Sequence, residues 1–197
     1  MSECRLYLIS PPGLPTDFPT LLERACAAGD IAALRLHLPA ADAAAIAQAV
    51  AAIRPVTLRF DVALILAGDA ALARQLGCDG VHLDGPAQDV AAARRAVGDD
   101  LQLGVSCGFS RDAAMQAGED GADYVTFGPY VTPEDDTGLL SWWAELMELP
   151  VVAEGANDVQ AAAVLARAGA DFVALGGDIW ADPALHVRAF AALLEPT

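Results

Sequence analysis

Two glycine-containing segments near the end of the sequence have the composition of an anion-binding loop. Residues 154–157 read Glu-Gly-Ala-Asn and residues 176–178 read Gly-Gly-Asp, and each segment follows a short apolar run. Glycine lets backbone N–H groups approach a phosphate closely. The residues expected to bind a phosphate are Gly155, Ala156, Gly176 and Gly177. The simpler interpretation is that these glycines only make tight turns, and the carboxylates of Glu154 and Asp178 would repel a phosphate.

Other side chains suited to chemistry also follow apolar runs. Arg35 carries a fixed positive charge and His37 titrates near neutral pH, so either could contact a ligand. If His37 faces a pocket, it could act with Glu154 as the acid and base of a small-molecule enzyme. Asp69 and Asp84 could hold a divalent metal, although the position of Asp69 before a helical stretch favours a helix cap. Strand register decides which of these side chains face a pocket, and a single sequence does not fix it.

The composition excludes several classes of function. The 197 residues include 11 basic and 27 acidic side chains, and a net charge of −16 argues against binding to nucleic acid or to an anionic membrane surface. All the basic residues are arginines, which excludes a Schiff base, a P-loop and a lysine clamp on phosphate. The four cysteines lack metal-ligand spacing, no apolar run approaches the ~20 residues of a membrane helix, and no signal peptide opens the sequence. We therefore expect a cytoplasmic protein with free thiols.

Eight apolar runs of strand character alternate with alanine-rich stretches of helical spacing. The expected strands cover residues 5–9, 31–38, 62–66, 80–83, 101–105, 124–127, 151–153 and 172–175. The expected helices cover residues 17–28, 42–53, 69–76, 90–97, 111–119, 138–147, 158–168 and 182–194. Eight strand–helix units predict a parallel sheet closed into a compact single-domain (β/α)8 TIM barrel over residues 1–197. A doubly wound open sheet is the alternative, but it more often has five or six strands.

A Gly-x-Asp phrase precedes three of the expected strands. Its aspartates are Asp79, Asp123 and Asp171. The glycine is expected to end the preceding helix in a left-handed conformation, and the next two residues lead into a buried strand. In a barrel of this kind, chemistry belongs on the loops that follow the strands, so the candidate residues above would gather at one end.

An ordered series of short phrases along the chain is similar to that of a known enzyme family. The phrases are Gly80-Val81-His82-Leu83, Gly104-Val105-Ser106, Gly121-Ala122-Asp123-Tyr124-Val125, Gly128-Pro129, Leu149-Pro150-Val151-Val152-Ala153 and Ala168-Gly169-Ala170-Asp171-Phe172-Val173-Ala174. Each phrase is weak alone. In this order and spacing they resemble thiamine phosphate synthase and its TenI relatives, over nearly the whole chain.

The resemblance implies an enzyme that joins a pyrimidine diphosphate to a thiazole phosphate and releases pyrophosphate, with Mg²⁺ assisting the leaving diphosphate. It implies Arg35, His37 and Ser106 as the candidate catalytic residues. If Mg²⁺ binds, the resemblance points to a rearranged site that uses Asp69 with Asp84 or Asp89.

The sequence departs from the family where the family holds its diphosphate. The Gln-x-Arg-x-Lys of the family aligns with Arg35, His37 and Pro39, and one metal-binding aspartate falls at Ala87. The family has a lysine in the loop after Gly128-Pro129, where this chain has three acidic residues at 134–136. A diphosphate with about three negative charges would be repelled by such a loop.

We therefore expect a catalytically degenerate paralogue that binds a small phosphorylated or heterocyclic ligand at the barrel mouth. One alternative is an active thiamine phosphate synthase with a rearranged Mg²⁺ site. Another is a non-catalytic regulatory or interaction barrel, which predicts that Arg35 or His37 pairs with local acids. The family resemblance and the apolar outer helices also lead us to expect a homodimer.

Overall fold

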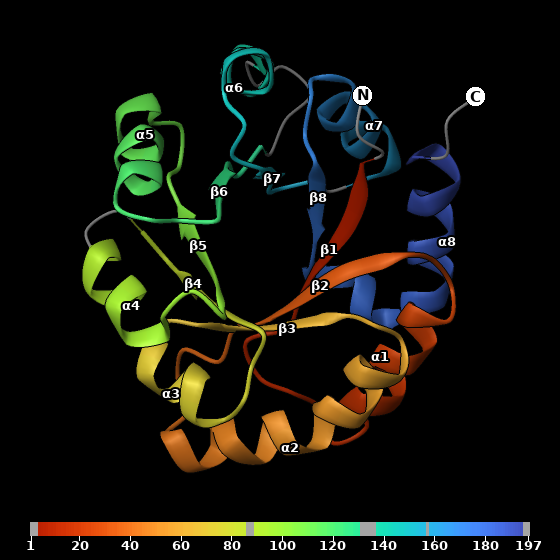
Figure 1. Cartoon of the computed structure of the whole chain (residues 1–197). Coiled ribbons are helices and arrows are strands. Elements are labelled where there is room, and N and C mark those ends of the chain that lie inside the picture. Colours follow the sequence, from red (N-terminus) through yellow and green to blue (C-terminus); the bar gives the residue numbers. More distant parts are fainter. Residues whose placement is uncertain (1–3, 86–88, 131–136, 157, 195–197) are drawn as a thin grey trace.

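The computed structural model is a closed eight-stranded parallel barrel surrounded by helices (Figure 1). It describes residues 4–85, 89–130, 137–156 and 158–194. The acidic residues at 134–136, Asn157 and Ala87 therefore lie outside the described residues. Neighbouring strands pair in chain order, and β8 pairs with β1 to close the barrel. The predicted (β/α)8 barrel is confirmed.

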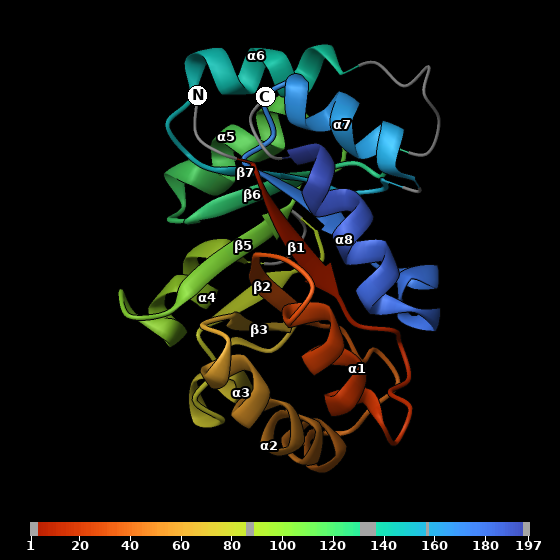
Figure 2. The same ribbon diagram turned by 90° about the vertical axis from the view of Figure 1, so that its right-hand side faces the viewer.

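The strands and helices alternate without exception along the described chain. The strands are β1 Arg5–Ile9, β2 Ile31–Leu36, β3 Ala63–Ala67, β4 Gly80–Leu83, β5 Gln102–Ser106, β6 Tyr124–Phe127, β7 Val151–Ala153 and β8 Phe172–Leu175. The helices are α1 Phe18–Cys26, α2 Ala43–Arg59, α3 Ala70–Gln75, α4 Val90–Val97, α5 Arg111–Glu119, α6 Gly138–Leu146, α7 Val159–Arg167 and α8 Pro183–Leu194. A short 3-10 helix, η1 Gly177–Ala181, separates β8 from α8. Turned by 90°, the molecule shows the helices on the outside of the strands (Figure 2).

One predicted helix is longer than expected. The predicted helix ends at residue 53, and Pro55 lies just beyond it, where a proline removes a backbone donor from a helix interior. In the structure α2 continues through Pro55 to Arg59. Thr57 in this added turn is fully buried, and its hydroxyl donates to the carbonyl of Arg54. Tertiary packing of the last turn thus outweighs the missing hydrogen bond.

Side chains alternate between the inside of the barrel and the layer beneath the helices. The inner apolar cluster holds Tyr7, Ala33, Ile65, Tyr124, Val152 and Ala174. The residues next to these in sequence, such as Leu34 and Val125, belong to the larger core between strands and helices. Because side chains alternate with a period of two, Arg35 points into the barrel like Ala33, two residues before it. Thr126 and Glu154 point inward for the same reason, since they lie two residues after Tyr124 and Val152.

Four aspartates at the amino ends of the even-numbered strands bind the odd-numbered strand before them. The carboxylates of Asp79, Asp123 and Asp171 accept the backbone N–H groups of Leu64 in β3, Leu103 in β5 and Val151 in β7, at 2.7, 2.7 and 2.9 Å. Each aspartate also donates its own N–H to the carbonyl of the same residue. Asp30, before β2, instead accepts two hydrogen bonds from the side chain of Arg5 in β1. The Gly-x-Asp phrases therefore stabilise the end of the barrel opposite the mouth.

None of the described helices is both long enough and apolar enough to cross a membrane.

Candidate functional site at the barrel mouth

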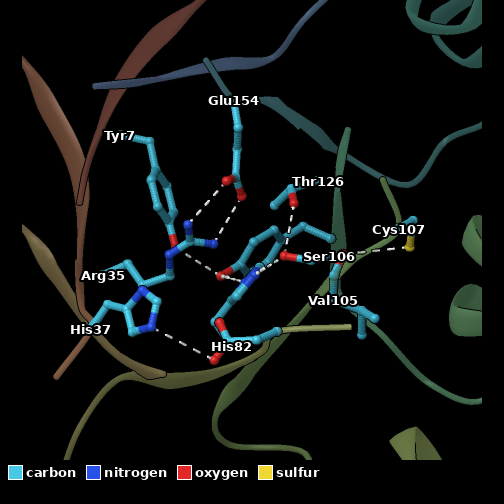
Figure 3. Close-up of polar contacts among 11 residues, drawn as sticks. Tyr7, Arg35, His37, His82, Val105, Ser106, Cys107, Thr126 and Glu154 are labelled. Atoms are coloured by element: carbon cyan, nitrogen blue, oxygen red, sulfur yellow. Dashed lines mark hydrogen bonds and ion pairs between the residues drawn. The ribbon is translucent and has the colours of Figure 1, made fainter. Parts of the chain in front are cut away.

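Polar side chains from five strands and the loop after a sixth meet in the interior of the barrel (Figure 3). We call this group the mouth network, and it consists of Tyr7, Arg35, His82, Ser106, Tyr124, Thr126 and Glu154. All but Ser106 and Glu154 are buried, and those two are partly exposed. The network therefore connects the closed interior of the barrel to its open end.

Arg35 and Glu154 form a two-pronged ion pair within this network. Nη1 and Nη2 of Arg35 donate to Oε1 and Oε2 of Glu154 at 2.9 and 3.1 Å. The guanidinium also lies 6.0 Å from the ring centroid of Tyr7, within cation–π distance. Burial acts to lower the pKa of Arg35, but the Glu154 carboxylate outweighs it and the pKa is raised. Arg35 thus stays charged, and Glu154 already occupies the face of the guanidinium that could clamp an anion.

The ion pair leaves one guanidinium nitrogen of Arg35 without a hydrogen bond to any described residue. Nε of Arg35 is buried and has no hydrogen-bond partner among the described residues. A buried donor without an acceptor costs free energy, so a ligand that supplied an acceptor here would be favoured.

A hydrogen-bonded chain continues from Tyr7 to the exposed end of β5. The hydroxyl groups of Tyr7 and Tyr124 are 3.0 Å apart, and the Tyr124 hydroxyl is 3.1 Å from Nδ1 of His82. Nε2 of His82 is 2.8 Å from Oγ of Ser106, which also accepts a hydrogen bond from Thr126 at 3.3 Å. The contacts join β1, β6, β4 and β5 across the interior.

Burial holds the titratable members of this chain in their neutral forms. It raises the pKa of Tyr7 to about 12 and that of Tyr124 well above its ordinary value. Burial, with the positive charge of Arg35, lowers the pKa of His82 well below its ordinary value. His82 is therefore a neutral imidazole near pH 7, with one nitrogen as donor and the other as acceptor.

A missing side chain in β5 makes room for this chain of contacts. A Cβ atom on Gly104 would lie 2.0 Å from Cζ of Tyr124 and 2.3 Å from its hydroxyl oxygen. The ring of Tyr124 therefore occupies the space above Gly104, stacked at 5.7 Å between centroids on the ring of His82. Glycine in the middle of a strand is explained here by the close approach of a side chain.

His37 and Asp84 lie beside the mouth network rather than in it. Nε2 of His37 is 4.0 Å from Oδ2 of Asp84, and its backbone N–H donates to the hydroxyl of Ser10. The side chains of His37 and Asp84 are 37% and 46% exposed, so the pair is open to solvent. Arg35 thus pairs with Glu154, and His37 lies close to Asp84.

Two of the predicted metal ligands, Asp69 and Asp89, line one open cleft between α3 and α4, but no third ligand joins them among the described residues. The carboxylate of Asp69 caps α3 by accepting the N–H of Leu72, and that of Asp89 caps α4 in the same way at Ala92. Asp84 faces His37 instead. In the part of the chain that the structure describes, no group of three His, Cys, Asp or Glu residues could hold a metal. The described residues thus offer Mg²⁺ no assembled set of protein ligands.

The glycine-containing loops after β7 and β8 have different roles. Gly155 has φ of +102°, and a Cβ there would lie 2.5 Å from the backbone N and O of Tyr130, so this glycine permits close packing of two loops. Gly177 has φ of +62° with open space around it, and Gly176 packs against Ile9. At Gly155 the positive φ and the close approach of Tyr130 account for the glycine. Phosphate binding at Gly155, Ala156, Gly176 and Gly177 remains a prediction.

Tyr7, Tyr124 and His82 were not among the predicted site residues. The sequence does carry a signal for the tyrosines, since Tyr7 and Tyr124 interrupt apolar strands with hydroxyl groups that need partners when buried. Burial raises the pKa of the Cys107 thiol to about 12, so this cysteine is unreactive near neutral pH.

Comparison with known proteins assigns the chain to a family. The family model described as thiamine monophosphate synthase matches residues 6–179. The chain belongs to the thiamine monophosphate synthase family. It is 46% identical to a thiamine-phosphate synthase of Rhodospirillum centenum over 97% of this chain and 96% of the relative. It is 42% identical to one of Hyphomonas neptunium, over 97% and 94% of the two chains.

Solved structures agree on the fold. A thiamine phosphate pyrophosphorylase from Pyrococcus furiosus superimposes with a TM-score of 0.83 at 22% identity, covering 98% of this chain and 96% of the other. Arg35, Ser106 and Glu154 of the mouth network lie at or near the carboxyl ends of their strands, where (β/α)8 barrels carry their chemistry.

Proposed function

We propose that this member of the thiamine monophosphate synthase family binds a small, largely uncharged heterocyclic ligand at the barrel mouth and does not displace diphosphate. The observation that carries the proposal is the bidentate ion pair of Arg35 with Glu154. It neutralises the cation inside the mouth, and a clamp on diphosphate needs cations that are free to bind oxygen.

Charge around the mouth supports the same conclusion. Asp69, Asp84, Glu154 and Asp178 follow four different strands, and the sequence contains no lysine. Two unit charges of the same sign repel each other by about 4 kcal/mol at 4 Å near a protein surface. A ligand without a diphosphate avoids this repulsion, and the partly exposed hydroxyl of Ser106 gives it a polar group to contact.

An active thiamine phosphate synthase is the second candidate. Identity of 46% over 97% of the chain to a relative that bears this name favours it. Under this proposal Mg²⁺ would bind between substrate oxygens and Asp84 or Asp69, since magnesium often uses one or two carboxylates and the substrate phosphates. Arg35, His37 and Ser106 would then contact the substrates.

One assay distinguishes the two candidates. The purified protein is incubated with the pyrimidine diphosphate and the thiazole phosphate, with and without Mg²⁺, and pyrophosphate release is measured. We expect release at the rate of the protein-free control. Release that depends on both Mg²⁺ and the protein, and that is lost in Ser106→Ala, would establish the active synthase instead.

A further inference from the structure

The contacts among Tyr7, Tyr124, His82 and Ser106 leave one hydroxyl hydrogen unused. The three hydroxyl groups and the neutral imidazole carry four polar hydrogens. The chain has three contacts, at 3.0, 3.1 and 2.8 Å, and each consumes one hydrogen. One hydrogen must therefore point out of the chain, from Tyr7, from Tyr124 or from Ser106.

The surroundings of Ser106 favour the third of these positions. Ser106 Oγ accepts the hydroxyl hydrogen of Thr126, so its own hydrogen is not used there. Tyr7 and Tyr124 are buried, whereas Ser106 is partly exposed at the end of β5. A hydroxyl hydrogen that has no acceptor in the protein raises the free energy least at a position where water or a ligand can accept it.

The contacts of Tyr7 favour the same direction at the other end of the chain. The guanidinium of Arg35 lies beside Tyr7 and is itself held by Glu154. A guanidinium has no acceptor, and Tyr124 is the hydrogen-bond partner of the Tyr7 hydroxyl among the described residues, so the Tyr7 hydrogen points to Tyr124. In that direction Tyr7 donates to Tyr124, Tyr124 donates to Nδ1 of His82, and Nε2–H of His82 donates to Ser106.

We propose that His82 is a positioning residue that acts through Ser106. It carries its hydrogen on Nε2, fills the second lone pair of Ser106 and so directs the Ser106 hydroxyl hydrogen into the mouth. The mouth therefore presents a fixed hydrogen-bond donor at this point. It selects a ligand with an acceptor there, such as an unprotonated ring nitrogen or a carbonyl oxygen, and disfavours one that offers a donor. The choice of ligand rests on the proposed function; the direction of the chain does not.

The tautomer of His82 tests the direction of the chain in the unmodified protein. Nitrogen-15 NMR of the imidazole rings at pH 7.5 separates protonated from unprotonated ring nitrogens, and a His82→Gln spectrum assigns the signal. We expect hydrogen on Nε2 and none on Nδ1. His186 is an internal reference of the opposite kind, because its Nδ1 is 2.8 Å from the carbonyl of Asp182 and must donate. Hydrogen on Nδ1 of His82 would overturn the proposal.

A matched pair of probes tests what the donor selects. Pyridine and benzene have the same shape, but only pyridine has a ring acceptor, and at pH 8 it is uncharged. We expect the protein to bind pyridine about 3- to 10-fold more tightly, the ratio that one hydrogen bond gives. In Ser106→Ala and His82→Leu the ratio falls to about 1, and in His82→Gln, whose amide can donate to Ser106, it partly recovers. His186→Gln is the control and keeps the wild-type ratio.

The two experiments fail in different ways. If His82 carries its hydrogen on Nε2 but neither probe binds, the positioning role stands and the proposed heterocycle site is wrong. If pyridine binds with the same preference in wild type and in folded His82→Leu, His82 does not position Ser106.

Discussion

The carboxylate of Glu154 reaches across the barrel from the end of β7 to hold the guanidinium of Arg35 from β2, through hydrogen bonds of 2.9 and 3.1 Å. The two strands are not neighbours, since β8 and β1 lie between them. The pair therefore closes part of the mouth from the inside. It also gives a buried arginine the partner that it needs in order to remain charged.

Removing this carboxylate should create an anion site. In Glu154→Gln the guanidinium of Arg35 keeps its charge but loses its counter-ion, so we expect inorganic phosphate to bind at least tenfold more tightly than to wild type. The variant should also lose about 2–3 kcal/mol of stability, because a buried charge is left without its ionic partner. Calorimetric titration and urea unfolding measure the two effects. Glu145→Gln removes the same charge from an exposed position on helix α6 and should do neither. Equal phosphate affinity in the two variants would contradict the prediction.

A methyl group at Gly104 should disrupt the mouth network. The Cβ of Gly104→Ala would lie 2.0 Å from Cζ of Tyr124, so the ring must move and lose its contacts with Tyr7 and His82. Overpacking of this kind typically costs about 1–3 kcal/mol, and we expect the upper end of that range. The free energy of unfolding in urea measures it. Gly13→Ala is the matched control, since nothing lies within 4 Å of its added methyl. The prediction is wrong if both variants unfold at the same urea concentration.

Acid should destabilise the protein partly through His82. Burial and Arg35 lower the pKa of His82 in the folded state, so below pH ~6.5 the unfolded chain binds a proton that the folded one does not. Stability contributed by the neutral imidazole is complete above that pH. As the pH falls it decreases, by at most about 1.4 kcal/mol per pH unit. Unfolding free energies between pH 5 and 8 should therefore fall more steeply for wild type than for His82→Gln. Parallel curves would show that His82 titrates normally in the folded protein.

Asp79 should stabilise the closed end of the barrel. Burial acts to raise its pKa, but hydrogen bonds from Arg54 and from the N–H of Leu64 outweigh this and the pKa is lowered. Its contribution is thus complete above pH ~3.8 and is lost as the pH falls through the lowered value. Asp79→Asn should cost about 1 kcal/mol at pH 7, a modest figure because the side chain is 38% exposed. Chemical unfolding measures it, and Asp99→Asn in an exposed turn should be neutral.

Much of the fold could be predicted because it depends on local patterns. The lengths of the apolar runs and the glycines that follow several of the helices indicate strands and turns whatever the rest of the chain does. Where a pattern was ambiguous, long-range packing decided, as at Pro55, where burial of Thr57 extends α2.

The site could be predicted only in part, because it depends on which side chains from different strands lie at the same level along the barrel axis. Arg35 was a candidate site residue because an arginine carries a fixed positive charge. Its partner Glu154 is 119 residues away in sequence, and only the stagger of strands in the closed barrel brings the two together. The role of Tyr124 depends on the empty space at Gly104, which is a property of a neighbouring strand. Once one inward-facing residue of each strand is known, the alternation of side chains also predicts that Arg35 and Glu154 face inward.

The four aspartates at the closed end divide the chain into successive βαβα modules, each fastened internally by its own aspartate. The contacts of Asp30, Asp79, Asp123 and Asp171 with the preceding odd-numbered strand all lie within a module, whereas the ion pairs of Asp79 with Arg54 and of Asp123 with Arg94 join one module to the next. A circularly permuted chain that opens between α4 and β5 would keep all four strand contacts local in sequence, but it would place Arg94 and Asp123 in opposite halves of the chain. One that opens between α3 and β4 would separate Asp79 from Leu64 in sequence and turn a local contact into one between the two ends of the chain.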